Sequence, residues 1–465
     1  MNVVMIALEA ARADHLSCYG YGRQTTPNLD RLVEDGVVFD NHFTPAVPTQ
    51  PAFTTIFSGA HPLTHRIIAH EAPLNPNPKI TWLPLLLRHH NYTTVAIDTL
   101  IDHRPWFARG FEYYVNPCRR GDLPDSDSVN QRAIEWLEHC RREPFFLHLH
   151  YWDGHLPYRP DNANRQLFYQ GDPTTQNVGS LNRFYEQSAG CGAGYTWLED
   201  LLKTWPTKVG SRIEDVDFLI AQYDAELRTA DHGIGQICEM LKSLDLWPDT
   251  LVMVYGDHGV ELGGEHGIYF DHYGLYDANL RVPLIMHWPE KLDGGRRVSA
   301  MSQQQDLLAT VLDAIGADVS DLVEGRSLLP LARGTQTVSH WNHTLMACEC
   351  TYQAKWALRT AEYKLIVSRE PDFHGRPPVE LYDLLDDPLE LHNLATRNRP
   401  LVEKLLDKFD TTLKRMLEAR HMKGDPIAPG RLSLGRQVFK QIGKPYPPRD
   451  PKWKGHVAPV IAGIP

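Results

Sequence analysis

The sequence predicts an α/β protein with a mostly parallel central sheet flanked by helices, followed by a smaller antiparallel α+β subdomain towards the C-terminus. Short β-rich runs alternate with longer segments of helical periodicity through most of the chain, a pattern typical of parallel strands joined by crossover helices. After residue 289 the pattern changes to closely spaced β-rich runs and one helical segment. The 465 residues, 42% of them hydrophobic, exceed one ordinary domain and can bury a large core.

Each element is expected where apolar periodicity and turn residues mark it. The predicted elements are, in chain order, a strand at 3–8, helices near 26–35 and after Thr49, a strand at 93–98, a helix near 128–141, strands at 145–151 and 251–255, short strands at 356–360, 363–368 and 380–384, and a helix near 400–420.

Changes in composition divide the chain into three parts. We expect the α/β domain at 1–335 and the smaller subdomain at 336–423. Residues 171–211, rich in small and polar residues, are interpreted as an insertion near the active site. The tail at 424–465 is rich in Pro, Gly and basic residues and is expected to be extended. It would wrap its own subunit or a neighbouring copy, so a homo-oligomer formed through this tail is an open expectation.

Composition and charge exclude several classes of function. The net charge of −11, with acidic and basic residues interspersed, provides no basic stripe for a nucleic-acid backbone. No stretch approaches about 18 uninterrupted apolar residues, so no membrane span is expected. The start MNVVMIAL resembles a first strand rather than a signal peptide, and seven cysteines without metal-ligand spacing indicate reduced thiols. We therefore expect a cytoplasmic protein that acts on a small molecule.

Polar residues follow three of the predicted strands, at the edge where reactive groups of parallel sheets collect. They are Glu9, the segment HYWDGH at 150–155, and GDHG at 256–259. In a turn, an aspartate and a histidine side by side can converge on one metal ion. Taken alone, GDHG is more typical of a capping aspartate with a surface histidine, and Glu9 is equally compatible with an ion pair to Arg12. Arg12 and Asp14 are expected to hold the first loop together.

Several segments together resemble the sulfatase family of the alkaline phosphatase superfamily. The chain opens with LEAARADHLSCYGYGRQTTPNLDRL and continues with FSGAHPLTHRI, YWDGHLPY, YDAELRTADHGIGQI, GDHGVELGGEHG, LRVPLI, EGRSLLPL and ELYDLLDDPLELHNLA. The resemblance covers nearly the whole chain in order. It implies the fold of that family, ester hydrolysis, and a divalent metal ion beside the nucleophile.

The nucleophile position departs from the sulfatase pattern. In this family a cysteine or serine within a CxPSR motif is converted to formylglycine, and here TQPAF stands in that place. Thr49 therefore takes the nucleophile position, no formylglycine can form, and Phe53 replaces the arginine. The segment AIDTL around Thr99 also lacks the lysine and histidine of the GKWH-like motif. Both departures remove positive charge from the site that would hold the anion.

The resemblance assigns the metal to Glu9, Asp257 and His258, with Thr49 completing the site. The family usually has aspartate at position 9, and Ala10 stands where calcium-dependent sulfatases have a second acid. One ligand fewer and an imidazole favour a single Mn²⁺ or Zn²⁺ over Ca²⁺, which prefers oxygen ligands.

A second metal bound by His148, His150 or Asp153 is an alternative, because two-metal relatives exist. The family pattern gives these residues no ligand role.

Further residues receive catalytic or binding roles from the resemblance. His155, in WDGHLPY, matches a histidine that contacts the anionic group or protonates the leaving group. His266 and His272, in GEHGIYFDHYGLYD, lie where the family has a lysine with a neighbouring histidine, and are also assigned to catalysis. Thr99 and Asp271 are assigned to substrate binding. For the three histidines, a hydrogen-bonded structural role is the alternative.

The threonine favours a metal-dependent hydrolase of phosphate diesters or phosphonate monoesters. A formylglycine hydrate expels sulfate by collapsing to an aldehyde, whereas a sulfated threonine would need attack by water at sulfur. A phosphothreonine can be hydrolysed by an in-line water. Two alternatives stay open: a sulfate-ester hydrolase without formylglycine, and a catalytically silent family member that binds an anion.

Overall fold

The computed structural model covers most of the chain. It describes residues 1–71, 74–160, 162–175, 180–185, 213–289, 291–319, 323–338, 341–370, 372 and 375–427. Most of the predicted insertion at 171–211 and nearly all of the predicted tail at 424–465 lie outside these ranges.

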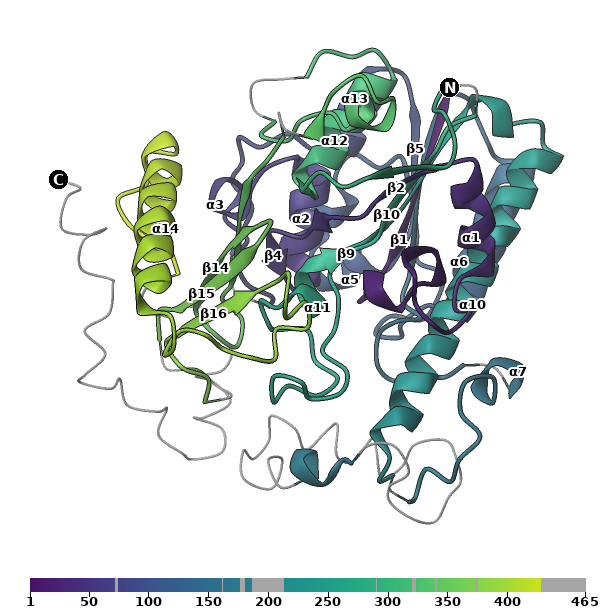
Figure 1. Cartoon of the computed structure of the whole chain (residues 1–465). Coiled ribbons are helices and arrows are strands. Elements are labelled where there is room, and N and C mark those ends of the chain that lie inside the picture. The colour runs from purple at the N-terminus through teal and green to yellow at the C-terminus, as the bar shows by residue number, and fades with distance from the viewer. Residues whose placement is uncertain are drawn as a thin grey trace.

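An eight-stranded sheet forms the centre of the molecule (Figure 1). Its strands lie in the order β11 (Arg296–Val298), β2 (Val37–Phe39), β10 (Leu284–His287), β8 (Thr250–Gly256), β1 (Asn2–Leu8), β7 (Phe145–Tyr151), β5 (Thr93–Ile97) and β6 (Tyr113–Val115). β8, β1, β7, β5 and β6 run parallel, and β10 is antiparallel to both of its neighbours. The mostly parallel sheet predicted from the alternation of strands and helices is thereby confirmed.

Helices cover both faces of this sheet because alternate residues of a strand point to opposite sides. Val4 and Ile6 pack in one apolar cluster with α1 (Pro27–Glu34), α6 (Ser126–His139) and α10 (Val216–Ser243). Val3 and Met5 pack in a second cluster with α2 (Thr49–Ser58), α4 (Leu83–His89) and α12 (Gln305–Ala314). Figure 1 shows α1, α6 and α10 on one side of the sheet and α2 and α12 on the other.

The long helix α10 was not among the predicted elements, because two glycines interrupt its helical pattern. Gly233 and Gly235 each cost about 1 kcal/mol relative to alanine in a helix interior. A Cβ at Gly233 would lie 2.8 Å from the Cβ of Ser126, and one at Gly235 would lie 2.6 Å from Oδ1 of Asn28. The glycines therefore let α10 approach α6 and α1 closely, which local sequence patterns do not reveal.

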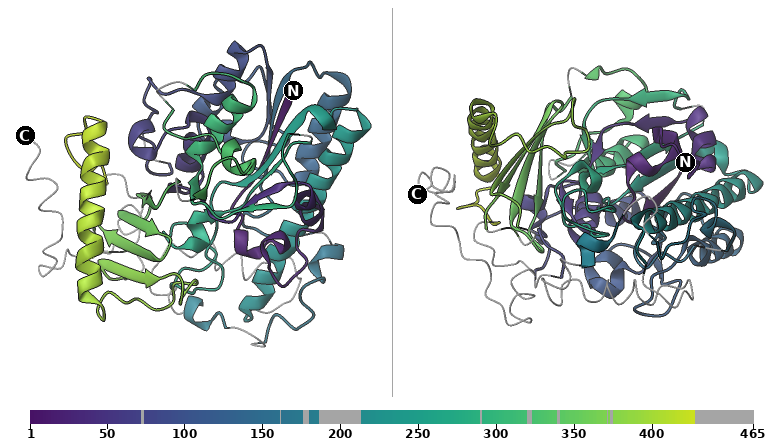
Figure 2. Two further views of the ribbon diagram at one scale, coloured as in Figure 1. Left: turned by 45° about the horizontal axis from the view of Figure 1, so that its top comes forward. Right: turned by 60° about the horizontal axis from the view of Figure 1, so that its bottom comes forward.

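A separate five-stranded sheet occupies the C-terminal side of the molecule (Figure 2). Its order is β16 (Val379–Asp383), β15 (Tyr363–Ser368), β14 (Lys355–Thr360), β13 (Thr344–Glu349) and β4 (Ala46–Val47), and its neighbours are antiparallel except β13 and β4. α14 (Arg399–Ala419) packs against it through side chains such as Phe409 and Leu413. β4 lies outside the predicted subdomain at 336–423, so this sheet is built from two distant parts of the chain.

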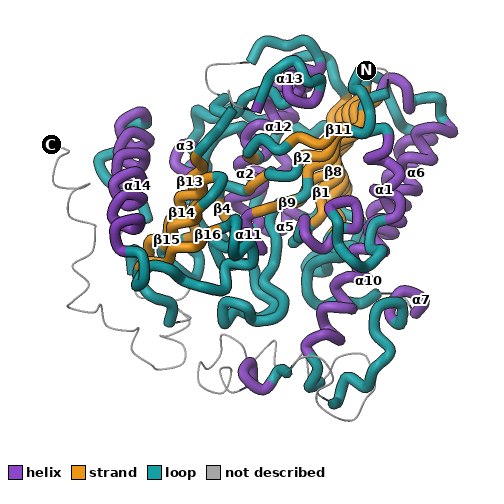
Figure 3. Tube along the Cα trace, in the orientation of Figure 1, coloured by secondary structure: helices purple, strands orange, loops and turns teal. Residues whose placement is uncertain are grey.

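The remaining elements are short, and Figure 3 shows β4 and β9 between the two larger groups of strands. A three-stranded sheet contains β12 (Ser302–Gln303), β3 (His42–Phe43) and β9 (Arg281–Val282). The short helices are α3 (Pro62–His65), α5 (Leu100–His103), α7 (Asn162–Arg165), α11 (Asp277–Leu280) and α13 (Leu329–Ala332). Among the described residues, no helix combines the length and the apolar character needed to cross a bilayer.

Candidate active site

Four polar side chains meet where the carboxyl ends of β1 and β8 face the start of α2. The parallel register aligns the last residues of the two strands, so Glu9 and Asp257 follow side by side. Thr49 is the first residue of α2, and Pro51 is tolerated in the first turn, where no helical N–H partner is required. His258 completes the group, and all four polar side chains are buried.

The Thr49 hydroxyl lies between the carboxylate and the imidazole. Its Oγ1 donates to Oε1 of Glu9 at 2.8 Å and lies 3.2 Å from Nε2 of His258. The same nitrogen lies 3.3 Å from Oε1 of Glu9 and 3.2 Å from Oδ2 of Asp257. The backbone N–H of Ala10 donates to the other oxygen of Asp257 at 3.1 Å, which fixes the orientation of that carboxylate.

The ionisation of this group suits a divalent cation. Burial would raise the pKa of Glu9, but hydrogen bonds from His150 and His258 keep it well below its usual range. Burial and the charge of Glu9 raise the pKa of Asp257 to about 8. Burial opposes the charged form of His258, yet Asp257 and Glu9 outweigh it and raise its pKa to about 9.

The residues also fit a metal by their donor atoms. Oδ2 of Asp257 is buried and, apart from its 3.2 Å contact with Nε2 of His258, has no hydrogen-bond partner in the described part of the chain. The ligand atoms of Glu9, Asp257 and His258 all lie within 4.8 Å of one another. Two carboxylates, an imidazole and a hydroxyl can bind one divalent ion, which would displace the protons that these groups otherwise hold.

His150 and Asp98 extend this group, and sequence reasoning missed their role. His150 Nε2 lies 3.0 Å from Oε2 of Glu9, and its Nδ1 lies 2.9 Å from Oδ1 of Asp98. Burial opposes the charge on this ring, but Asp98 and Glu9 outweigh it and raise the pKa of His150 to about 10. His150 therefore orients Glu9 and balances its charge. The only local signal is that His148 and His150 alternate on one face of a buried strand.

A cavity of about 270 Å³ opens beside Thr49. Its lining combines histidines with aromatic residues, and within the described chain it contains no lysine or arginine; the lining includes His70, His103, Trp152, His155, Phe270, Asp271, His272, Tyr273 and Tyr352. Burial lowers the pKa of His70 to about 3, so its ring is neutral at pH 7. The lining side chains thus bring little positive charge to an anionic ligand.

Three of the predicted residues face this cavity together. The His272 ring stacks on His258 with centroids 4.9 Å apart, and it lies 5.6 Å from the His155 ring. Burial lowers the pKa of both His155 and His272, so both are neutral at pH 7. Nδ1 of His155 lies 2.6 Å from the carbonyl oxygen of Leu156, to which it donates, leaving Nε2 as the free nitrogen. Burial also raises the pKa of Asp271 to about 7.

Thr99 was expected to bind substrate, but it does not line this cavity. Its backbone N–H donates to Oδ1 of Asp98 at 2.6 Å, and its hydroxyl is buried without a hydrogen-bond partner among the described residues. Thr99 therefore helps to fix Asp98, which in turn holds His150.

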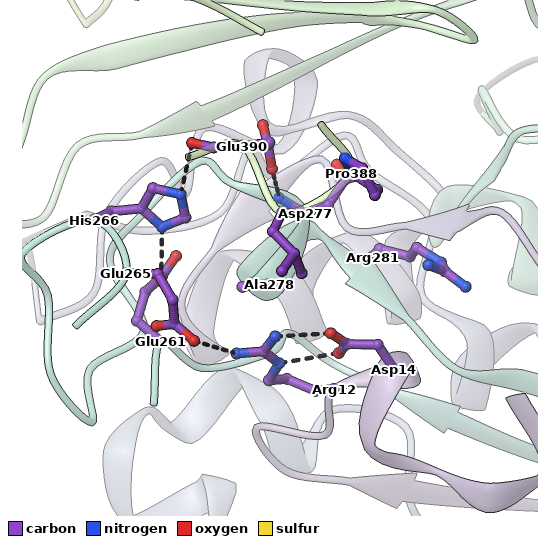
Figure 4. A pocket seen from close by; sticks show the side chains of 11 residues that line it. Arg12, Asp14, Glu261, Glu265, His266, Asp277, Ala278, Arg281, Pro388 and Glu390 are labelled. Atoms are coloured by element: carbon purple, nitrogen blue, oxygen red, sulfur yellow. Dashed lines mark hydrogen bonds and ion pairs between the residues drawn. The ribbon is translucent and has the colours of Figure 1, made fainter. Parts of the chain in front are cut away.

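His266 faces a different and smaller cavity, of about 40 Å³ (Figure 4). Its Nδ1 lies 2.9 Å from Oε2 of Glu261, and its Nε2 lies 3.1 Å from the carbonyl oxygen of Glu390. Burial would lower the pKa of His266, but Glu261 outweighs it and raises the value. The structure does not bring His266 to Thr49, because both ring nitrogens are engaged elsewhere. His266 therefore has a hydrogen-bonded structural role, which was the alternative to a catalytic one.

The contacts of Arg12 in this small cavity decide whether Glu9 forms an ion pair with Arg12. Arg12 pairs with Asp14, with Nη2 and Oδ2 at 2.7 Å, as expected for the first loop (Figure 4). Its Nε also donates to Asp14, and its Nη1 approaches Glu265 and the carbonyl oxygen of Val260. Arg12 is thus occupied on this side, and the partners of Glu9 are Thr49 and the two histidines.

His103 is a further cavity residue that sequence reasoning missed. The segment around Thr99 lacks the lysine and histidine of the GKWH-like motif, yet α5 places His103 in the cavity four residues later. Its ring stacks on Trp152, with centroids 5.7 Å apart and an interplanar angle of 14°. Helical spacing after Thr99 was the available signal.

Comparisons with known proteins agree with this architecture. The sulfatase family model matches residues 1–317, and the model for the C-terminal part of N-sulphoglucosamine sulphohydrolase matches residues 264–419. The multifunctional alkaline phosphatase superfamily protein PehA of Trinickia caryophylli is 25% identical and covers 85% of this chain and 91% of its own. The N-acetylglucosamine-6-O-sulfatase of Bacteroides thetaiotaomicron is 23% identical, and the alignment covers 84% of this chain and 82% of that protein.

Solved structures show the same fold. The phosphonate monoester hydrolase of Agrobacterium radiobacter aligns with a TM-score of 0.67 at 21% identity, covering 90% of this chain and 96% of that one. The phosphonate monoester hydrolase of Silicibacter pomeroyi aligns with a TM-score of 0.69 at 20% identity, and the alignment covers 90% of this chain and 95% of that one. Since the sulfatase model spans more than half of the sequence, the chain belongs to the sulfatase family of ester hydrolases.

Proposed function

We propose that this chain is a metal-dependent hydrolase of phosphate diesters or phosphonate monoesters that uses Thr49 as its nucleophile. The observation that carries the proposal is the Thr49 hydroxyl, buried and hydrogen-bonded to Glu9 at 2.8 Å at the start of α2. A nucleophile next to a base that a third group orients is the usual arrangement in covalent catalysis. Here His150 is that orienting group.

The metal in this proposal is a single Zn²⁺ or Mn²⁺ bound by Glu9, Asp257, His258 and Thr49. The mixed nitrogen and oxygen donors favour these ions over Ca²⁺. When bound, the ion would lower the pKa of the Thr49 hydroxyl and offset the charge that develops on the ester oxygens.

The chain's own residues move the protons. Glu9 accepts the Thr49 proton as Oγ1 forms a bond to phosphorus and the bond to the leaving oxygen breaks. One of the two rings, His155 or His272, gives a proton to the leaving oxygen and then takes one from the water that attacks phosphorus. As that water adds, the bond between phosphorus and Oγ1 breaks and Glu9 returns its proton to Thr49. An anionic ester raises the pKa of a neighbouring imidazole, so substrate binding favours the protonated rings that the first step needs.

The charge of the cavity supports a singly charged ester. Its described lining contains no lysine or arginine, and His70, His155 and His272 are neutral at pH 7. A dianionic phosphomonoester would give up much of its hydration without gaining a fixed cation from these side chains. Phosphate diesters and phosphonate monoesters carry one negative charge, and Asp271 can hydrogen-bond their uncharged groups when it is protonated.

Sulfate-ester hydrolysis is a second candidate, and the comparisons support it at least as well. Sulfate esters are also singly charged, both family models are named for sulfatases, and the relatives include sulfatases. The nucleophile is what favours phosphoryl transfer, since Thr49 cannot form the aldehyde that expels sulfate.

Hydrolysis of matched substrates tests the proposal. Metal-stripped protein is reloaded with Mn²⁺, Zn²⁺ or Ca²⁺ and assayed with an aryl phosphodiester, phosphonate monoester, phosphomonoester and sulfate ester of the same phenol. We expect the diester or the phosphonate to have the highest kcat/KM with Mn²⁺ or Zn²⁺. A sulfate ester as the best substrate would establish the second candidate. No turnover of any ester with any ion would indicate a silent family member that binds an anion.

A further inference from the structure

A second group of metal-ligating side chains lies at the edge of the Thr49 cavity, apart from the metal group described above. His70 and His103 line that cavity, and Glu71 lies between them. Nε2 of His70 is 3.6 Å and Nδ1 of His103 is 3.8 Å from Oε1 of Glu71. One ligand atom from each of the three residues falls within a common radius of 4.8 Å.

These separations suit a shared ion better than a hydrogen-bonded cluster. Both are longer than the roughly 2.7–3.2 Å of a nitrogen–oxygen hydrogen bond. Around a tetrahedral Zn²⁺, with bonds of about 2.0–2.2 Å, neighbouring ligand atoms are about 3.3–3.5 Å apart. The two imidazoles therefore approach the carboxylate to near the spacing of a coordination shell.

The three side chains are held in place by contacts outside the group. Gln50 donates to Oε1 of Glu71 at 2.7 Å and accepts from the Glu71 backbone N–H at 3.1 Å. The backbone N–H of His70 donates to the hydroxyl of Thr351 at 3.0 Å, and His103 stacks on Trp152. Such fixed supporting contacts reduce the cost of ordering ligands around an ion.

The charge of Glu71 is only partly balanced in this arrangement. Nη1 of Arg104 lies 3.4 Å from Oε2 of Glu71, on the oxygen that does not approach the histidines. Oε1 is left to Gln50 and the two imidazoles. Glu71 is exposed by 44%, so an ion could reach it directly from solvent.

We propose that His70, Glu71 and His103 form a second divalent-cation site, of the Zn²⁺ class, at the edge of the Thr49 cavity. Two imidazoles and one carboxylate are a donor set that Zn²⁺ favours, and three protein ligands leave one position for water or a ligand oxygen. Gln50, which holds Glu71, directly follows Thr49, so the two sites are adjacent along the chain. This site does not depend on which ester the protein hydrolyses.

Metal stoichiometry tests the second site without reference to activity. The full chain is stripped with a chelator, saturated with Zn²⁺, desalted and analysed for bound zinc. We expect two ions per wild-type chain, and one per chain in His103→Ala and in Glu71→Gln. Asp257→Asn, which alters the buried group, should retain the ion at His70, Glu71 and His103. Reloading Asp257→Asn with Co²⁺ should then give the absorption bands of a tetrahedral site, and these should disappear in Asp257→Asn/His103→Ala.

The surface provides a matched control. His139 and Glu138 form an exposed pair with nitrogen and oxygen 3.7 Å apart, and no third ligand is grouped with them among the described residues. His139→Ala should keep two ions. The proposal is overturned if wild-type protein binds no zinc, or if His103→Ala and Glu71→Gln both bind as many ions as wild type; a single wild-type ion that both variants lose would instead count against the buried site at Asp257. Both altered side chains are partly exposed, and thermal melting confirms that each variant is folded.

Discussion

Two of the histidine-bearing cavities in the described part of the chain, one around His266 and one beside Thr49, differ in whether their ionisable groups are paired with one another. Around Arg12 and His266, in a cavity of about 40 Å³, each imidazole nitrogen and the guanidinium have partners within the wall. Around Thr49, in about 270 Å³, His155 and His272 are neutral, and neither forms an ion pair within the described chain. Paired groups hold a fold together, whereas unpaired buried groups indicate a place for a ligand.

One segment of the chain contributes to both cavities. Residues 257–277 bring Asp257, His258, Asp271 and His272 to the first site, and Glu261, His266 and Asp277 to the second. The antiparallel bridge between Glu261 and Asp271 fixes this segment where it passes from one cavity to the other. The difference between the cavities therefore comes from which face of a single loop each residue occupies.

The largest expected effect comes from removing the hydroxyl at the Thr49 cavity. Thr49→Val keeps the shape of the side chain and should lower kcat/KM on the order of 10³-fold or more, because the covalent step loses its nucleophile. Steady-state kinetics with the best ester measure this. Thr54→Val in the same helix is the control, since the Thr54 hydroxyl donates to the carbonyl oxygen of Gln50 and Thr54 is not among the described residues that line the Thr49 cavity. Full activity in Thr49→Val would exclude covalent catalysis through this residue.

The next largest effect is expected on the affinity for a metal ion at Asp257 and His258, beside the Thr49 cavity. Asp257→Asn should weaken the buried metal by more than the roughly 10–100-fold typical of supporting residues, because it removes a ligand. In wild-type protein, affinity should rise between about pH 6 and pH 9, since Asp257 with a pKa of about 8 and His258 with a pKa of about 9 must lose protons to bind the ion. Calorimetry in buffers of different ionisation enthalpy measures the protons released. Affinity independent of pH would contradict this assignment.

A smaller effect is expected at His155, which lines the Thr49 cavity and is proposed to give a proton to the leaving oxygen. His155→Gln should lower kcat on the order of 10²-fold, with a larger loss for poor leaving groups than for nitrophenol, because proton transfer to the leaving oxygen is removed. Burial lowers the pKa of His155, so its stabilising contribution is present above about pH 6.5 and is lost as pH falls through the folded-state value. Relative to wild type, the variant should therefore gain stability as the pH falls. An equal loss for all leaving groups would indicate a structural role instead.

The smallest effect on activity is expected at the small cavity around Arg12 and His266, whose ionisable groups are paired. His266→Gln should change kcat/KM only a few-fold but destabilise the fold by about 1–3 kcal/mol, because Oε2 of Glu261 or the carbonyl oxygen of Glu390 loses its buried hydrogen bond. The pKa of His266 is raised, so its contribution is present below about pH 6.5 and is lost as pH rises through the folded-state value. Denaturant unfolding should show a larger loss at about pH 6 than at about pH 9. A kcat loss matching that of His155→Gln would remove the distinction between the cavities.

The sequence predicted local elements better than their partners. The alternation of strands and helices indicated the parallel sheet, and strands such as 93–98 and helices such as 400–420 appear close to their predicted bounds. β4 was missed because two residues carry no periodicity, and it pairs with β13 about 300 residues later. α10 was missed because its glycines are explained only by the helices that they contact.

For the candidate site, residue type and position after a strand were sufficient to predict where some residues lie, but not others. Glu9, Asp257 and His258 follow parallel strands whose register brings their ends together, so their meeting could be anticipated from order along the chain. His266 and Thr99 were expected at the same place, yet a turn of the backbone directs each towards other partners. The sequence placed His150 at a strand end without indicating that it orients Glu9, and Asp98 and His103 were missed because the residues that face them come from other elements.

By itself, the sequence determined the chemical groups at the ends of the strands, the threonine at the start of α2, and the fold class. These follow from apolar periodicity, strand direction and residue chemistry, which are local or nearly so. Only the tertiary structure decided which buried charges are paired, which histidines face open space, and that His70, Glu71 and His103 come together at the cavity edge. The ionisation of a buried group depends on neighbours within a few ångströms in space, and those neighbours come from distant parts of the chain.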